Sequence, residues 1–183
     1  MIERALAVLA LVALAIAVVV GLLVARRRVP TWLAEDVALP TATAIATVAT
    51  LGSLAMSEIA GYVPCTLCWY QRIAMYPLVI VLAVAAARRD AQVWRTAVPI
   101  AAIGASVSVW HIAVERRPSL GGATCDPAAP CAVRWVEEFG FLTLPTMAGI
   151  AFLAIIVLVL AARTPLMSTA TSAIGHDGNT AAR

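Results

Sequence analysis

Four cysteines, arranged in two pairs, are the residues of this chain best suited to chemistry. Cys65 and Cys68 form a C-x-x-C motif, and five residues separate Cys125 from Cys131. A C-x-x-C motif brings two thiols close enough to close a small, readily exchanged disulfide ring, and the thiolate form controls such exchange. Four cysteines permit three pairings, and nearness in the sequence favours Cys65–Cys68 and Cys125–Cys131 in the resting protein.

The surroundings of the first pair favour a thiolate at Cys68. Cys68 falls at the predicted start of a helix, where unpaired backbone amides and the helix dipole favour negative charge. Arg72 follows four residues later, on the same helical face and about one turn deeper. The motif alone is equally compatible with a structural disulfide or with half of a metal site.

The second pair lies in a segment typical of a surface loop. The run from Cys125 to Cys131 holds two prolines and no helix signal. A disulfide here would be accessible, although it could also only staple the loop, or form half of a four-cysteine zinc site. Zinc sites usually use a C-x2-4-C spacing on both sides, and this spacing is longer. No histidine stands in the loop either, so we expect no metal ion.

The composition indicates a membrane protein with several spans. Of the 183 residues, 62% are hydrophobic and 13% are charged, and the mean hydropathy is +0.93. A soluble domain averages about 45–50% apolar and about 25% charged residues. A water-soluble globule, a disordered chain and a nucleic-acid binder are therefore excluded. A spanning helix needs about 20 apolar residues, and five segments qualify: Ala5–Ala25, Leu39–Tyr62, Trp69–Ala87, Val93–Val114 and Phe139–Ala162.

The arginines predict the orientation of these spans. Three groups of arginines follow alternate spans: Arg26–Arg28, then Arg88 with Arg89 and Arg95, and then Arg163. Because cytoplasmic segments are rich in arginine, these groups mark the cytoplasmic side. The N-terminus, both cysteine pairs and the loop 115–138 are then extracytoplasmic, where disulfides persist. We expect 1–28 to be an uncleaved helix with its arginine cluster, 29–38 a cytoplasmic connector, and 164–183 a disordered cytoplasmic tail.

The two pairs therefore have different expected surroundings. The first is only a few residues from its flanking spans, so it must lie at the membrane interface, where it can meet a lipid-soluble reagent. The second is on a longer loop and can meet a soluble protein. Together they could form an electron relay. A non-enzymatic membrane scaffold with two structural disulfides is the alternative from another class, although it leaves Arg72 unexplained.

Three segments carry a resemblance to a known family. They are Leu51–Ile59, with Leu-Gly-Ser-Leu and Ser-Glu-Ile, Pro64–Leu78, with Pro-Cys-Thr-Leu-Cys-Trp-Tyr-Gln-Arg and Met-Tyr-Pro-Leu, and Pro130–Pro145, with Pro-Cys and Phe-Gly-Phe-Leu-Thr-Leu-Pro. The sequence resembles the DsbB disulfide-bond formation proteins over residues 45–160, closest to their Gram-positive BdbC branch. The resemblance implies an all-α integral membrane protein with a four-helix transmembrane redox domain at 39–163, to which the first span adds an extra N-terminal transmembrane helix.

The resemblance also implies a function. Such a protein is a thiol oxidase of the bacterial plasma membrane that reoxidises a DsbA- or BdbD-like thioredoxin-fold partner and reduces a membrane quinone. The partner would attack the Cys125–Cys131 disulfide, with Cys125 the expected first target, and the electrons would pass to Cys65 and Cys68. By its match to the family motif, Cys68 would face the quinone, with Arg72 beside it.

Three further residues are candidates for quinone contact. Trp69 and Tyr70 could wall a quinone or serve as interfacial aromatics. Some family members carry a histidine near this site, but His111 is placed about one turn deeper, so it either faces the quinone or makes a helix contact.

The partner's redox potential and the composition bear on which electron acceptor the protein uses. A DsbA-type partner is already strongly oxidising, at about −120 mV, so a stronger electron sink is needed. The arginine-only, alanine-rich composition suggests a GC-rich genome, which together with the BdbC branch favours menaquinone over ubiquinone.

A protein like vitamin K epoxide reductase is the alternative within redox chemistry, but there the C-x-x-C usually follows the loop cysteines instead of preceding them.

Overall fold

Five long helices make up most of the protein. The computed structural model describes residues 2–164, and every helix in that range that is long and apolar enough to cross a membrane is one of these five. They are α1 (Ile2–Ala25), α2 (Ala38–Glu58), α3 (Thr66–Arg88), α4 (Trp94–Arg116) and α5 (Leu144–Ala162). The chain is thus a multi-pass, all-α membrane protein, as the composition predicted.

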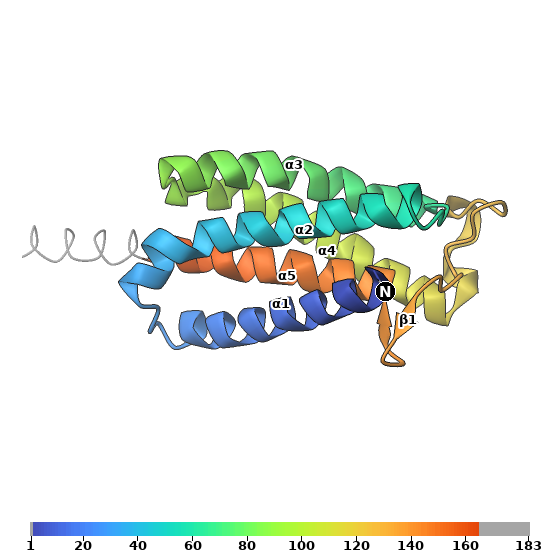
Figure 1. The fold of residues 1–183 in the computed structure, drawn as a ribbon, viewed down its shortest axis with the longest axis horizontal. Helices are drawn as coiled ribbons and strands as arrows, with labels where there is room; N and C mark the ends of the chain where they lie inside the picture. Colours follow the sequence, from blue (N-terminus) through green and yellow to red (C-terminus); the bar gives the residue numbers. More distant parts are fainter. Residues whose placement is uncertain (1, 165–183) are drawn as a thin grey trace, which may run out of the picture.

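The helices form a four-helix bundle with one added helix. Each of α2, α3 and α4 packs on the next helix in the chain, and α5 returns to lie against α2, which closes the bundle (Figure 1). The added helix, α1, packs along α5 on the outside of the bundle. A π-helical turn (Leu33–Val37) leads from the connector into α2, so most of the predicted connector 29–38 is helical.

The helices alternate in direction, so each end of the bundle collects a different set of residues. One end holds the N-terminus, the start of α3 and the loop between α4 and α5 (Figure 1). All four cysteines lie in or next to these segments. The arginine groups that follow α1, α3 and α5 lie at the opposite end. This separation is the one that the pattern of arginines predicted.

Two helix boundaries at the cysteine end differ from the prediction. α2 ends at Glu58 and not at Tyr62, because the chain leaves the helix and turns at Gly61, where φ is +74°. Such a φ is accessible to glycine without strain. α3 begins at Thr66, three residues before the predicted Trp69.

The predicted start of the fifth span at Phe139 was also wrong. A short antiparallel hairpin, β1 (Glu137–Glu138) with β2 (Leu142–Thr143), precedes α5, which begins at Leu144. Phe139 and Gly140 both have positive φ and reverse the chain between the strands. The apolar run from Phe139 therefore belongs partly to the hairpin.

Of the predicted tail, only residue 164 falls among the described residues; 165–183 lie outside them.

The start of α1 is fastened to the cysteine end of the bundle. The Tyr62 hydroxyl donates to the Glu3 carboxylate over 2.6 Å, and the Tyr62 ring stacks on Trp135 with ring centres 5.4 Å apart. Arg4 pairs with Glu138 of the hairpin at 3.6 Å. These contacts join α1 to the segment before α3 and to the loop that carries the second cysteine pair.

A close approach between α4 and α5 is built on one glycine. A Cβ atom added at Gly104 would lie 2.3 Å from the ring of Phe152, which is fully buried. Phe152 in turn belongs to the main apolar core, together with Leu78, Leu82 and Ile155.

We predict that Gly104→Ala lowers the thermal stability of the protein. Overpacking costs about 1–3 kcal/mol, and the gain in helix propensity returns at most about 1 kcal/mol. The measurement is thermal unfolding in one detergent. Gly21→Ala is the matched control, because its Cβ would meet Val157 at an ordinary 3.7 Å. Equal melting temperatures for the two variants would contradict the proposed close packing.

Candidate redox site and adjoining cavity

Cys65 caps the N-terminus of α3. Its backbone is extended, and its sulfur accepts a hydrogen bond from the backbone N–H of Cys68 over 3.3 Å. The two sulfurs lie 3.0 Å apart, and both cysteines are free thiols. The Cys65–Cys68 disulfide expected at rest is therefore not formed, since an S–S bond is about 2.05 Å long. The structure holds the dithiol form of this pair.

His111 of α4 lies against the same pair. Its Nε2 is 3.6 Å from the Cys65 sulfur and 3.2 Å from the carbonyl oxygen of Cys131. The hydrogen bond with Cys68, and after it the one with His111, lower the pKa of Cys65 to about 4, although burial opposes them. The sequence argument had placed the thiolate at Cys68. The structure favours it at Cys65, because the Cys68 thiol and then His111 hydrogen-bond the Cys65 sulfur, which also accepts the capping hydrogen bond from the Cys68 N–H.

The second pair forms the disulfide that sequence proximity predicted. Cys125 and Cys131 are bonded to each other. Cys131 is buried in one small apolar cluster with Cys65, Leu67 and Val114, and Cys68 and Cys125 pack against that cluster. His111 touches both pairs through Cys65 and Cys131. The loop disulfide and the C-x-x-C pair therefore adjoin at one end of the bundle.

Cys65, Cys68 and His111 are also of the residue types that bind metals. Their ligand atoms lie within 4.8 Å of one another, which the sequence analysis missed because His111 is distant in the chain. However, two sulfurs bound tetrahedrally to one zinc ion at about 2.3 Å would be about 3.8 Å apart. The observed 3.0 Å lies between this distance and the roughly 2.05 Å of an S–S bond, so the two sulfurs are about 0.8 Å too close for that zinc geometry.

Arg72 is a buried charge inside a spanning helix. Its Nε donates to the Ser53 hydroxyl over 2.9 Å, and its Nη2 donates to the Ser53 carbonyl and the Ser57 hydroxyl at 2.8 and 3.0 Å. The guanidinium also lies 5.2 Å from the ring centre of Trp69. None of the hydrogen bonds found among residues 2–164 uses Nη1, which leaves it for a ligand.

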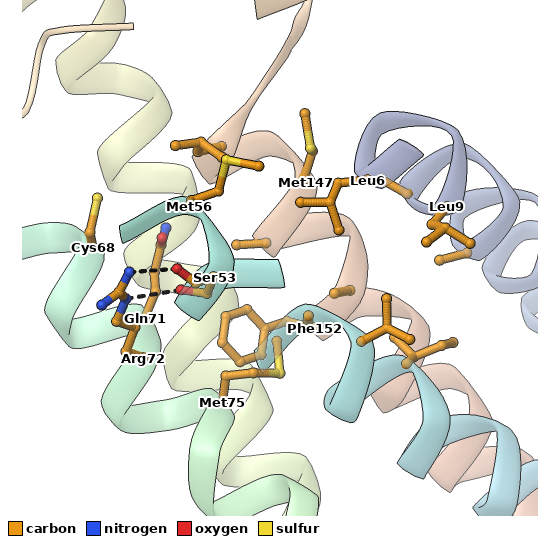
Figure 2. A pocket seen from close by; sticks show the side chains of 18 of the residues that line it. Leu6, Leu9, Ser53, Met56, Cys68, Gln71, Arg72, Met75, Met147 and Phe152 are labelled. Atoms are coloured by element: carbon orange, nitrogen blue, oxygen red, sulfur yellow. Dashed lines mark hydrogen bonds between the residues drawn. The ribbon is translucent and has the colours of Figure 1, made fainter. Parts of the chain in front are cut away.

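A cavity of about 360 Å³ begins beside Cys68 and Arg72. It lies between α1, α2, α3 and α5 (Figure 2). Polar side chains gather at the end next to the cysteines, and most of the remaining wall is aliphatic. Three aromatic residues, Tyr62, Tyr76 and Phe152, also line the cavity. The lining includes Leu6, Leu9, Val12, Ile16, Thr41, Ile45, Val48, Ser53, Met56, Cys68, Gln71, Arg72, Met75, Tyr76, Met147 and Phe152.

The other three candidate residues lie outside this cavity. Trp69 and Tyr70 are half exposed on the bundle surface, and Trp69 lines a shallower pocket on the other side of Arg72. His111 lines a small pocket with Cys65, Cys68 and Glu115. In this structure His111 therefore contacts the thiol pair and the loop. Of the five predicted site residues in α3 and α4, only Cys68 and Arg72 line the cavity.

Tyr76 is a residue that the sequence analysis did not single out. It lines the cavity, and its hydroxyl is buried and has no hydrogen-bond partner among the described residues. A buried polar atom without a partner is uncommon and calls for an explanation. The spacing of Cys68, Arg72 and Tyr76, each four residues apart, puts all three on one helix face and was a usable signal.

These features define a class: a membrane-embedded protein in which a dithiol and a disulfide adjoin beside an apolar cavity. The family model described as "Disulfide bond formation protein DsbB" matches residues 35–162. The chain belongs to this DsbB family, as the sequence motifs indicated. α1 lies outside the matched region.

Individual relatives agree with this assignment. The chain is 44% identical to Disulfide bond formation protein C of Bacillus subtilis over 114 residues, which cover 62% of this chain and 83% of that protein. It is also 44% identical to Probable disulfide formation protein C of Bacillus cereus over 125 residues, or 67% of this chain and 89% of that protein. No solved structure matches the chain.

We predict that Cys65 titrates as an acidic thiol. In reduced protein carrying Cys125→Ser and Cys131→Ser, the first thiolate should form with a midpoint near pH 4, so the thiolate dominates at neutral pH. The thiolate absorbance as a function of pH measures this midpoint. Cys68→Ala should raise it further than His111→Ala does, because Cys68 makes the larger contribution. A first midpoint near the ordinary value of 9.0 would contradict this assignment.

Proposed function

We propose that this protein is a membrane thiol oxidase that passes electrons from an extracytoplasmic thioredoxin-fold protein to a quinone. The observation that carries the proposal is the continuity of the site. The loop disulfide adjoins the C-x-x-C pair through Cys131 and Cys65, and Cys68 and Arg72 border the apolar cavity. Electrons can therefore move from a surface loop to a membrane-embedded acceptor within one chain.

The cavity suits a lipid-soluble quinone. Its wall is apolar apart from one end, as ligand pockets commonly are, with a few polar groups that fix orientation. The free Nη1 of Arg72 and the hydroxyl of Tyr76 would hold the quinone carbonyls beside Cys68. When bound, the quinone supplies an acceptor for two electrons and two protons.

The first transfer takes place on the loop. A dithiol partner attacks the Cys125–Cys131 disulfide, first at Cys125, to form a mixed disulfide and release Cys131 as a thiolate. The second partner thiol then displaces Cys125. The partner leaves as a disulfide, and the loop pair has gained two electrons. Disulfide exchange proceeds by this kind of thiolate attack through a mixed disulfide.

The second transfer brings the electrons to the C-x-x-C pair. Starting from an oxidised Cys65–Cys68 pair, the Cys131 thiolate attacks the sulfur of Cys65 and releases Cys68. Cys125 then attacks Cys131, restores the loop disulfide and releases Cys65. A thiol of low pKa is a better leaving group, so the lowered pKa of Cys65 favours this last step. His111 lies where it can hydrogen-bond the departing thiolate.

The arginine groups support the orientation that this function needs. Arg26–Arg28, Arg88, Arg89 and Arg163 gather at one end of the bundle, which we assign to the cytoplasm. The cysteines then face the extracytoplasmic side of a bacterial plasma membrane, and the C-terminus is cytoplasmic. We retain menaquinone as the preferred acceptor from the composition and the branch, with a DsbA- or BdbD-like protein as the electron donor.

The test is a coupled assay with the full-length chain in detergent. A reduced DsbA-type protein and a soluble quinone are added, and the partner thiols and the quinone absorbance are followed together. We expect one partner disulfide for each quinone consumed, and we expect Cys68→Ser to abolish both signals.

A pair of arginine variants tests the cavity's part in the reaction. Arg72→Gln should lower kcat/KM for the quinone about 100-fold, since it removes a charged donor at the reacting group. Arg95→Gln is the matched control, because Arg95 also lies over a tryptophan, Trp94, but far from the cysteines. Partner oxidation without quinone loss would show that a quinone is not the electron acceptor. Four cysteines that do not react would support a structural scaffold instead of a thiol oxidase.

A further inference from the structure

We propose that α1 forms the outer wall of an elongated site, in which the long apolar tail of the quinone lies between α1 and α2. This inference deepens the proposed function: it assigns α1, which the family match leaves out, to selecting quinones that carry such a tail. Four observations support it.

The cavity is much longer than a quinone ring. Its lining on α2 runs from Met56, near the cysteine end, to Thr41, near the opposite end. At 1.5 Å per residue these fifteen steps span about 22 Å, most of the apolar thickness of a membrane. On α1 the lining runs from Leu6 to Ile16. An occupant that fills this length must be an extended chain.

The chemistry of the wall changes along this length. Cys68, Gln71, Arg72 and Ser53 all line the cysteine end. Deeper in, the wall consists of aliphatic residues such as Ile16, Ile45 and Val48, with Thr41 at the far end. One polar head and a long apolar tail match this distribution, whereas a compact polar ligand would leave the deep part without partners.

α1 has two different faces, and only one of them packs tightly. Ala10, Ala13 and Ala17 are buried, Ala13 and Ala17 cluster with Ala154 of α5, and Ala10 and Ala13 also border the cavity. The larger residues Leu9 and Val12 line the cavity and remain 47% and 50% exposed. Small residues let α1 approach α5 closely, while its large side chains reach toward α2 without filling the space between the helices (Figure 2).

Near the polar end of this space, a side chain of α1 touches α2. A Cβ atom at Gly52 of α2 would lie 2.7 Å from Leu6, so the glycine lets that side chain reach α2 (Figure 2 shows Leu6 beside the cavity). Gly52 directly precedes Ser53, which holds Arg72. α1 therefore contacts α2 near the polar end, and the cavity extends between the two helices from there toward Thr41.

Binding measurements on the full-length protein test the proposal. Two radiolabelled quinones with the same ring, one with a long isoprenoid tail and one without a tail, are titrated onto the protein in detergent. Val12→Trp should fill part of the cavity and weaken binding of the tailed quinone by at least about tenfold, or about 1.4 kcal/mol. Binding of the tail-less quinone should change by less than about twofold, because the head site is untouched.

Val18→Trp is the matched control. Val18 is on the same helix and is 53% exposed, but it does not line the cavity, so the variant should bind both quinones as the wild type does. Leu9→Trp gives a second cavity-filling variant if Val12→Trp does not fold. Unchanged binding of the tailed quinone to both folded cavity variants would overturn the proposal, and so would an equal loss for both quinones.

The same titration separates this proposal from the function beneath it. If the wild type binds the tail-less quinone but the tail adds no affinity, the tail site fails while the quinone site stands. If the wild type binds neither quinone, the proposed function fails and the tail site fails with it. A photoreactive group placed in the tail should label α1 peptides in the wild type, and labelling confined to α3 and α4 would also overturn the proposal.

Discussion

The buried guanidinium of Arg72 is the constraint on which the arrangement of this protein depends. A charged side chain costs about 2.5–3.5 kcal/mol at the centre of a membrane span on insertion scales, so a guanidinium inside α3 needs hydrogen-bond acceptors. Ser53 and Ser57 meet this need from α2. The pairing fixes the register of α2 against α3 and leaves a cationic donor at one end of an otherwise apolar cavity. The polar end of the site is thus a consequence of satisfying one charge.

The start of α3 provides the second half of the site. Cys65 caps the helix, so its sulfur is close to the Cys68 backbone N–H and to the Cys68 sulfur. The helix then carries Cys68, Arg72 and Tyr76 along one face into the cavity. Cys65 is left on the other side, where His111 and Cys131 meet it. One helix terminus therefore divides the pair into a sulfur that faces the loop and a sulfur that faces the membrane.

Much of this could be predicted from sequence, because membrane spans and cysteine motifs are strong local signals. The five spans, the all-α class and the loop disulfide follow from such signals. The boundary at Phe139 was mistaken because an apolar hairpin and an apolar helix start look alike in hydropathy. His111 beside Cys65 and the cavity between α1 and α2 depend on how separate helices pack. The spacing of Tyr76 from Cys68 and Arg72 was a local signal for its helix face, but its unpaired buried hydroxyl becomes visible only once the helices are packed.

In the proposed function, electrons leave the protein from the Cys65–Cys68 pair to a quinone in the adjoining cavity. The most direct measurement is a single turnover without partner, using fully reduced protein with Cys125→Ser and Cys131→Ser. Quinone is added, quinol is followed by absorbance, and the cysteine pairing is mapped by mass spectrometry. We predict about one quinol per chain, formed together with a Cys65–Cys68 disulfide, since one disulfide releases two electrons. Thiols that stay reduced in excess quinone, or quinol formed without that disulfide, would contradict the account.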